Sequence, residues 1–353
     1  MREIVLGKKT VRNFSAPYII AEIGANHNGD MELAKKMIKA VADCGADAAK
    51  FQSWDGSSLI AKEEYDRNQS YDDGDGGKKH FGSLKDMVDK YYLRPEQHHE
   101  LKAYCDELGI DFCSTPFSEK EVELLESCKV PFYKVASMDI NNVQLLNYIA
   151  EKNKPVILST GMARMWEIDK AVELLTQRGV KDIALLHCIS IYPPAHEDIH
   201  LNNITMLQQA FDLPIGFSDH SIGFSIPLAS VALGACIIEK HFTTDKDLPG
   251  WDHQISADPT ELKVICEQSP IISVSLGNHY RTLSAAEESK KAKFRRSVVV
   301  KHDLPVGHVL TEEDLTSKRP GTGISPDQMH MLVGRSLNQD VQGDTLMRWE
   351  WLS

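Results

Sequence analysis

The sequence lacks long apolar runs, paired cysteine spacings and an excess of positive charge. No uninterrupted apolar run reaches about 18 residues, which argues against a transmembrane helix. No apolar signal-peptide segment follows Met1, and the seven cysteines are odd in number and unpaired in spacing. These features predict a cytoplasmic protein. The net charge of −12 argues against nucleic acid as a general partner, although an acidic protein can still hold a basic pocket for a phosphate.

Eight short apolar runs alternate with amphipathic stretches along most of the 353 residues. The runs, which read as buried strands, cover residues 18–24, 46–52, 111–117, 131–137, 155–160, 183–188, 214–220 and 236–242. The stretches between them have the i, i+3, i+4, i+7 spacing of helices, as at Ala34, Met37, Ile38 and Val41. This count predicts a parallel (β/α)8 TIM barrel. The alternative, a doubly wound open sheet, is disfavoured because no GxGxxG follows the first strand.

Four segments lie outside this repeat: an N-terminal hairpin, a long insertion, a linker and a C-terminal domain. A small β-hairpin is expected near residues 4–11, turning at Gly7, and a long polar insertion occupies residues 53–94. The final barrel helix is expected from Pro259 to about Leu276. We therefore predict a barrel domain over residues 1–277, a solvated linker over 278–294 and a small, mostly β domain over 295–353. The core of that last domain is small, so docking on another surface would help it.

Two segments near the end of the predicted barrel carry histidines. SDH at residues 218–220 and EKHF at residues 239–242 each close a buried strand. Strand alternation puts Ser218 and His220 on one face of their strand, and Glu239 and His241 on one face of theirs. If the strands are parallel neighbours, both imidazoles reach the same end of the sheet and suit a divalent first-row metal. Taken alone, such a pair is more often two unrelated histidines of the core or surface.

Other polar residues gather at the predicted carboxyl ends of the strands, where barrel active sites lie. They are Glu22, Lys50, Gln52, Ser114, Thr115, Lys134, Ser137, Ser159, Thr160 and Ser190. Most lysines are surface residues, but Lys50 and Lys134 are flanked by apolar neighbours, and burying an ammonium without a partner is costly. An anionic ligand would resolve that cost, with nearby hydroxyls as further hydrogen-bond donors. The pattern therefore predicts an anionic substrate.

With these segments in place, the chain resembles the sialic acid (nonulosonic acid) synthase family, and the N-acetylneuraminate synthases in particular. The matching segments are AEIGANHNG at 21–29, AKFQ at 49–52, CSTPF at 113–117, YKVAS at 133–137, LSTGM at 158–162, HCISIYP at 187–193, GFSDHS at 216–221 and EKHFT at 239–243. They occur in family order across the whole barrel. RRSV at 295–298 with RPGTGI at 319–324 resembles the family's antifreeze-like (SAF) domain.

The resemblance implies condensation of phosphoenolpyruvate with an open-chain N-acetylated hexosamine, giving a nonulosonic acid and phosphate. It implies that His220 and His241 hold a divalent metal, expected to be Mn²⁺, with Mg²⁺ or Co²⁺ possible. The positions matching the phosphoenolpyruvate site are Lys50, Thr115, Lys134, Ser137, Ser159 and Ser218. Those matching positions that face the sugar or the metal water are Glu22, Gln52, Tyr192 and Asp252. Arg319 matches an arginine that reaches the partner's barrel in a domain-swapped homodimer.

Departures from the N-acetylneuraminate enzymes cluster around the sugar. Asp139 replaces a glutamate, Ser190 replaces an asparagine, and GWDH at 250–253 replaces the commoner GPD. The insertion has no clear match to a sugar-contacting asparagine. The acceptor is therefore open between N-acetylmannosamine and a diacetamido-trideoxyhexose leading to legionaminic or pseudaminic acid.

Several alternatives stay open at this point. Asp139 or Glu22 could move a proton, while Glu239 could either orient a metal ligand or form a structural ion pair with a lysine. Competing enzyme readings are a synthase that uses an aldose phosphate and a Schiff-base aldolase or lyase with Lys50 or Lys134 as the nucleophile. A non-enzymatic reading is a carbohydrate- or ice-binding module on an inactive barrel.

Overall fold

The computed structural model describes residues 2–63, 84–250, 252–278 and 280–353. The chain divides into two compact units, Met1–Gly277 and Asn278–Ser353. Residues 64–83 of the predicted insertion, and Trp251 of the GWDH segment, lie outside the described residues.

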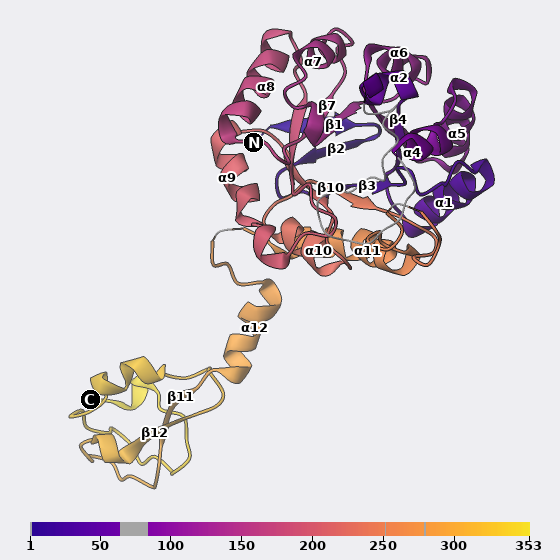
Figure 1. Cartoon of the computed structure of the whole chain (residues 1–353). Helices are drawn as coiled ribbons and strands as arrows, with labels where there is room; N and C mark the ends of the chain where they lie inside the picture. The colour runs from indigo at the N-terminus through magenta and orange to yellow at the C-terminus, as the bar shows by residue number, and fades with distance from the viewer. Residues whose placement is uncertain (1, 64–83, 251, 279) are drawn as a thin grey trace. The chain divides into compact units, whose positions relative to one another are not determined.

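The first unit contains an eight-stranded parallel sheet (Figure 1). Its strands are β3 (Tyr18–Glu22), β4 (Ala48–Ser53), β5 (Asp111–Pro116), β6 (Tyr133–Val135), β7 (Val156–Ser159), β8 (Ile183–Cys188), β9 (Ile215–Asp219) and β10 (Ile237–His241). The hydrogen-bonded order is β5-β4-β3-β10-β9-β8-β7-β6, and every pairing in it is parallel. The end strands β5 and β6 are in contact, which closes the sheet. The predicted (β/α)8 barrel is confirmed.

Helices follow the strands and cover the outside of the sheet (Figure 1). They are α1 (Met31–Cys44), α5 (Pro95–Leu108), α6 (Glu119–Ser127), α7 (Val143–Ala150), α8 (Met165–Gln177), α9 (Asn202–Phe211), α10 (Ser225–Ala232) and α11 (Pro259–Ser275). Local signals set their ends. The Asp30 carboxylate accepts from Glu32 N and Leu33 N at the start of α1, and Gly45 ends it in the left-handed region at φ 83°.

The hairpin of β1 (Glu3–Leu6) and β2 (Lys9–Arg12) has a short turn at Gly7, whose φ is 55°. Its buried side chains Ile4, Leu6 and Val11 share a core cluster with Tyr18, the first residue of β3. Other residues at or just before the starts of strands, including Ala48, Phe132 and Ile237, belong to the same cluster. The hairpin therefore packs at the amino ends of the strands. The carboxyl ends, which carry the polar residues, lie at the opposite end of the barrel.

The described parts of the insertion include α2 (Gly56–Leu59) and α4 (Leu84–Tyr91). Trp54 Nε1 donates to Val88 O at 3.2 Å, and Trp54, Val88 and Tyr91 share a small apolar cluster with Ala25. This cluster attaches α4 to the loops that follow β3 and β4, so α4 packs beside the carboxyl ends of these strands.

The second unit begins with the exposed helix α12 (Ala285–Phe294). It contains an antiparallel pair, β11 (Ser297–Val300) and β12 (Leu315–Lys318), and the short 3₁₀ helices η3 (Glu312–Asp314), η4 (Pro326–Met331) and η5 (Trp349–Trp351). Isolated bridges such as Val309 to Ser336 complete its β structure. Its core of Val298, Val300, Leu310 and neighbouring side chains is separate from that of the barrel, as the predicted small β domain requires.

Candidate active site

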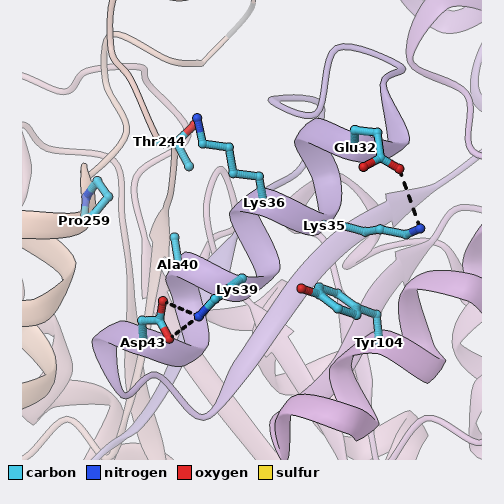
Figure 2. A pocket seen from close by; sticks show the side chains of 9 residues that line it. All are labelled: Glu32, Lys35, Lys36, Lys39, Ala40, Asp43, Tyr104, Thr244 and Pro259. Atoms are coloured by element: carbon cyan, nitrogen blue, oxygen red, sulfur yellow. Dashed lines mark hydrogen bonds and ion pairs between the residues drawn. The ribbon is translucent and has the colours of Figure 1, made fainter.

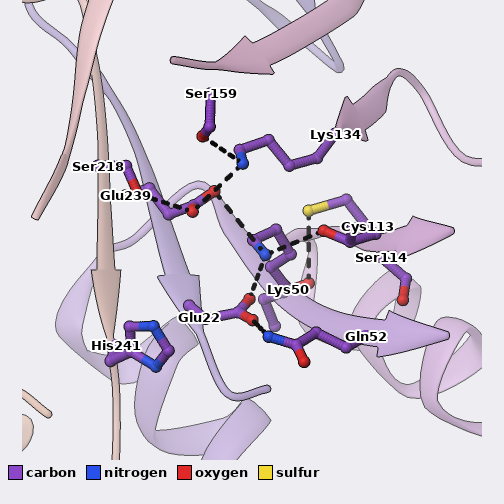
Figure 3. A network of polar contacts seen from close by, with 12 residues as sticks. Glu22, Lys50, Gln52, Cys113, Ser114, Lys134, Ser159, Ser218, Glu239 and His241 are labelled. Atoms are coloured by element: carbon purple, nitrogen blue, oxygen red, sulfur yellow. Dashed lines mark hydrogen bonds and ion pairs between the residues drawn. The ribbon is translucent and has the colours of Figure 1, made fainter. Parts of the chain in front are cut away.

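Lys50 lies in the middle of β4, at the centre of a buried polar network inside the barrel (Figure 3). Its Nζ is 2.7 Å from Glu22 Oε2 and donates to Thr115 Oγ1 at 3.3 Å. Glu22 Oε1 in turn accepts from Gln52 Nε2 at 2.9 Å. Lys50 and Gln52 are two residues apart on one strand, so alternation turns both towards Glu22. Four predicted site residues from β3, β4 and β5 are thus brought together.

Lys134, on β6, forms a second part of this network. Its Nζ donates to Ser159 Oγ at 2.7 Å and lies 3.5 Å from Glu239 Oε1. The other Glu239 oxygen is 3.9 Å from Lys50 Nζ, and Ser218 Oγ donates to Oε1 at 3.1 Å. Glu239 therefore lies between the two lysines. It accepts a hydrogen bond from Ser218 and forms ion pairs with both lysines, so the ion pair expected as one of its two roles is present.

Burial and mutual attraction shift the pKa values of this network. Burial raises the pKa of Glu22 to about 7, although Lys50 counteracts the shift. Burial alone would lower the pKa of Lys50, but Glu22 and Glu239 outweigh it and the net shift is upward. The pKa of Lys134 is lowered, chiefly by burial, and Glu239 only partly opposes the shift. Lys50 is thus the more firmly charged of the two lysines, and Glu22 can exchange a proton near neutral pH.

The two histidines lie side by side, with ring centroids 5.4 Å apart. His220 Nδ1 donates to Ile189 O at 2.7 Å, which leaves the Nε2 lone pair free for a ligand. Tyr192 stacks on His220 at 4.0 Å between centroids and meets His241 edge-on at 5.8 Å. The Asp252 carboxylate is 3.6 Å from His241 Nδ1. The sequence-predicted pair is therefore brought together, with Tyr192 and Asp252 beside it.

This histidine pair suits a divalent ion because both rings are neutral and have nitrogen lone pairs available. Burial lowers the pKa of His220 to about 4 and holds that of His241 well below its usual value, so both rings are neutral at pH 7. His241 Nδ1 is buried and makes no hydrogen bond in the described structure. No group of three His, Cys, Asp or Glu side chains among the described residues could hold a metal. A metal held by the two imidazoles would need water or substrate to complete its coordination.

Ser137, Ser190 and Asp139 occupy the loops after β6 and β8. Ser137 lies past the end of β6, as expected, and its Oγ accepts from Gly161 N at 3.0 Å. A Cβ on Gly161 would come within 2.8 Å of Ser137 Oγ and 2.3 Å of Ser190 Oγ, so both hydroxyls pack on this glycine. Asp139 is 8% exposed; burial raises its pKa, Asn142 donates to Oδ1, and Oδ2 has no hydrogen-bond partner.

Three buried residues around the site escaped the sequence prediction. Asn26 Nδ2 donates to Phe242 O and its Oδ1 accepts from Asp252 N at 3.3 Å, so it ties down the loop that carries Asp252. Asp219 and Lys240 form an ion pair beside the histidines. The last two could have been found, because a charged residue inside a buried strand requires a partner.

Two further features lie away from this network. Arg319 is exposed in the second unit, with its guanidinium carbon 5.3 Å from the centre of the Phe294 ring. A pocket along α1 is bordered by Lys35, Lys36 and Lys39 (Figure 2), but none of the predicted site residues lines it. Its Lys39 is paired with Asp43, so this pocket has the character of a solvated helix surface.

Comparison with known proteins places the chain in a family. Residues 37–281 match the NeuB family, and residues 295–352 match the SAF domain. N,N'-diacetyllegionaminic acid synthase of Campylobacter jejuni is 40% identical over 336 residues, covering 94% of this chain and 98% of that protein. N-acetylneuraminate-9-phosphate synthase of Homo sapiens is 35% identical over 333 residues, covering 94% and 91%.

A solved structure agrees with these matches. The N-acetylneuraminic acid (sialic acid) synthetase of Leptospira borgpetersenii, in complex with citrate, has a TM-score of 0.71 and 36% identity over 82% of this chain and 95% of that one. The chain belongs to the NeuB family of phosphoenolpyruvate-dependent condensing enzymes. Its second unit carries the SAF domain, and the homologues described above are nonulosonic acid synthases.

No helix in the described ranges, 2–63, 84–250, 252–278 and 280–353, has the length and apolar character needed to cross a membrane.

Proposed function

We propose that this enzyme joins C3 of phosphoenolpyruvate to the aldehyde carbon of an open-chain N-acetylated hexosamine. Water then adds at C2 of the former enol, and phosphate leaves with cleavage of its bond to C2. The products are a nonulosonic acid and inorganic phosphate. The observation that carries the proposal is the placement of two buried lysines, Lys50 and Lys134, within one ring of hydroxyls and carboxylates.

Phosphoenolpyruvate would bind against Lys50 and Lys134, beside the Glu239 carboxylate that lies between them. Lys50 and Lys134 supply positive charge, and the hydroxyls of Thr115, Ser159 and Ser218 already touch this network. Ser137 extends the row of donors from the next loop. Charge-assisted hydrogen bonds of this kind hold phosphate and carboxylate groups in a fixed orientation. Holding both substrates in this way accounts for a large part of the rate, because the reaction becomes effectively intramolecular.

His220 and His241 would hold the divalent ion, for which we favour Mn²⁺ over Mg²⁺ or Co²⁺. When bound, the ion supplies Lewis-acid stabilisation of charge on the aldehyde oxygen of the acceptor. The neutral imidazoles and the buried, unbonded Nδ1 of His241 support this assignment. Tyr192 stacks on His220 and thereby restricts the orientation of the ring.

Glu22 and Asp139 are the candidates for moving the proton of the attacking water. The pKa of Glu22, about 7, suits a group that gives and accepts a proton near neutral pH. Asp139 has a raised pKa and one unbonded carboxylate oxygen. Aspartate is one methylene shorter than the glutamate of the N-acetylneuraminate enzymes, so Asp139 would act through an intervening water.

For the acceptor we favour a diacetamido-trideoxyhexose, which would give a legionaminic-type product. Asp139 and Ser190 differ from the N-acetylneuraminate enzymes, and the 40% identical relative is named for N,N'-diacetyllegionaminic acid. Gln52 and Asp252 would face this sugar. Arg319 would reach it from the partner subunit of a domain-swapped homodimer, in which the SAF domain of one chain covers the barrel of the other.

The test is phosphate release from phosphoenolpyruvate with a panel of acceptors. The panel contains diacetamido-trideoxyhexoses, N-acetylmannosamine and its 6-phosphate, each with and without a chelator. We expect release with a diacetamido sugar, loss with the chelator and recovery on adding Mn²⁺. Release only with the 6-phosphate would identify an aldose phosphate synthase. A covalent adduct on Lys50 or Lys134 after borohydride treatment with pyruvate, together with indifference to the chelator, would overturn the proposal in favour of an aldolase.

A further inference from the structure

A buried ion pair lies directly behind the two histidines. Asp219 ends β9 and Lys240 is the penultimate residue of β10, so each immediately precedes a histidine. The two are cross-strand partners in the sheet register, both side chains are 0% exposed, and Lys240 Nζ is 2.6 Å from Asp219 Oδ2. Strand alternation puts them on the face opposite Glu239 and His241. They therefore take no part in the polar network inside the barrel.

This pair also fixes the chain on the far side of His220. Lys240 Nζ donates to Ser221 O, and Asp219 Oδ1 accepts from Ser221 N at 2.9 Å. The residues before and after His220 are thus both bonded into the same cluster. Lys240 connects that cluster to the residue before His241. A single buried contact therefore links the backbone at both imidazoles.

Stability alone does not require charges at these positions. Removing two charges from water is costly, and an apolar pair of similar volume often stabilises a fold as well or better. A directional contact instead restricts how the two strand ends lie relative to each other. His220 is also restrained by the bond from Nδ1 to Ile189 O and by the stacked Tyr192 ring, whereas His241 Nδ1 makes no hydrogen bond. The His241 ring meets Tyr192 only edge-on, so its direction depends in part on its own backbone.

We infer that Asp219 and Lys240 are positioning residues for the metal site. Their ion pair holds the carboxyl ends of β9 and β10 so that His220 and His241 point at one divalent ion. The inference rests on the proposed metal function. It adds two residues that touch neither the ion nor the substrate.

The test compares a double variant, Asp219→Leu with Lys240→Met, with the wild-type protein. The double variant leaves no buried charge unpaired, so we expect it to fold. It loses the hydrogen bonds to Ser221 N and Ser221 O, so it should melt below the wild type. Mn²⁺ affinity, measured by electron paramagnetic resonance of the free ion, should fall by about 10- to 100-fold, as for other residues that orient metal ligands. The KM for phosphoenolpyruvate should change little, because Lys50 and Lys134 are untouched.

A matched control removes another ion pair of the barrel. Lys9 Nζ and Asp47 Oδ2 are 2.9 Å apart, and Asp47 lies just before the amino end of β4. Lys9→Met with Asp47→Asn keeps an acceptor for Ile19 N, and it should leave Mn²⁺ affinity unchanged. Wild-type affinity in the Asp219/Lys240 double variant, or an equal loss in the control, would overturn the inference.

Two further sets of variants distinguish failure of the positioning role from failure of the metal assignment. If the double variant does not fold, Asp219→Glu keeps the charge but lengthens the side chain. It should still weaken Mn²⁺ binding, and unchanged affinity in this folded variant would refute the positioning role. His220→Ala and His241→Ala report on the proposed function itself. If they bind Mn²⁺ as tightly as the wild type, the metal assignment fails and the positioning role falls with it.

Discussion

Replacing each buried lysine by methionine should separate stability from substrate binding. At an effective dielectric constant of about 20, the attraction between unit charges is about 6 kcal/mol at 2.7 Å, the distance from Lys50 Nζ to Glu22 Oε2. It is about 4 kcal/mol at 3.9 Å, the distance from Lys50 Nζ to Glu239 Oε2. Lys50→Met thus removes the main charge partner of Glu22 and one of the two for Glu239. We expect a loss of about 3–5 kcal/mol in the free energy of unfolding, the usual cost of an unpaired buried charge.

Lys134→Met should be milder for the fold. The attraction between Lys134 and Glu239 at 3.5 Å is about 5 kcal/mol at the same dielectric constant. Burying the Lys134 charge is itself costly, and its removal offsets part of that lost attraction. Glu239 keeps the Ser218 hydrogen bond and the Lys50 charge. We therefore expect a loss of about 1 kcal/mol in the free energy of unfolding, the worth of an ordinary hydrogen bond.

Both variants should bind phosphoenolpyruvate more weakly. A charged hydrogen bond is worth about 1.5–3 kcal/mol, which corresponds to about 10- to 150-fold in Kd. Urea unfolding followed by circular dichroism gives the stabilities, and isothermal titration with phosphoenolpyruvate gives the affinities. Equal destabilisation by the two substitutions would refute the assigned pairing. Unchanged affinity in both would refute the anion site itself.

Three further perturbations address proton transfer, the second unit and the partner subunit. If ionised Glu22 is the base, its pKa of about 7 predicts that kcat/KM falls as the pH drops through about 7. If the same fall in kcat/KM persists in Glu22→Gln, another group is responsible for it. Burial opposes ionisation of Asp314, but bonds from His308 and Thr311 outweigh it and lower its pKa from 3.8 to about 2. The contribution of Asp314 to the free energy of unfolding is therefore complete above about pH 4 and is lost as the pH falls through 2. Asp314→Ala should lower the free energy of unfolding of the SAF unit by about 1 kcal/mol at pH 7 but by little at pH 2, as measured by thermal unfolding. Arg319→Ala should impair use of the sugar more than binding of phosphoenolpyruvate in steady-state kinetics; equal losses in both would remove its proposed role.

Some features of individual site residues were predictable from the sequence pattern within a few positions. Alternation along β4 predicted that Lys50 and Gln52 face inward together, and both contact Glu22. The burial of Lys134 followed from its apolar neighbours, and the short spacing to Ser137 correctly indicated a loop beyond the strand. These features depend on the chain within a few residues, where the period of a strand determines direction.

Contacts between distant strands could not be read in this way. The closed sheet brings Lys50 and Lys134 within 4 Å of Glu239. From the local sequence, a metal-binding histidine was just as reasonable a partner for Glu239. The same holds for Asn26, which bonds Phe242 O across 216 positions of the chain. Such contacts follow from strand order and register, which are set by the packing of the whole barrel.

By itself, the sequence determined the barrel, the small β domain and the set of polar residues at the strand ends. It could do so because hydrophobic period and strand alternation are local properties. The tertiary structure alone decided how those residues pair: Glu22 with Lys50, Glu239 between two lysines, and Asp219 with Lys240 behind the histidines. The physical reason is that charges buried in a low-dielectric interior must be compensated by whatever the closed sheet brings next to them.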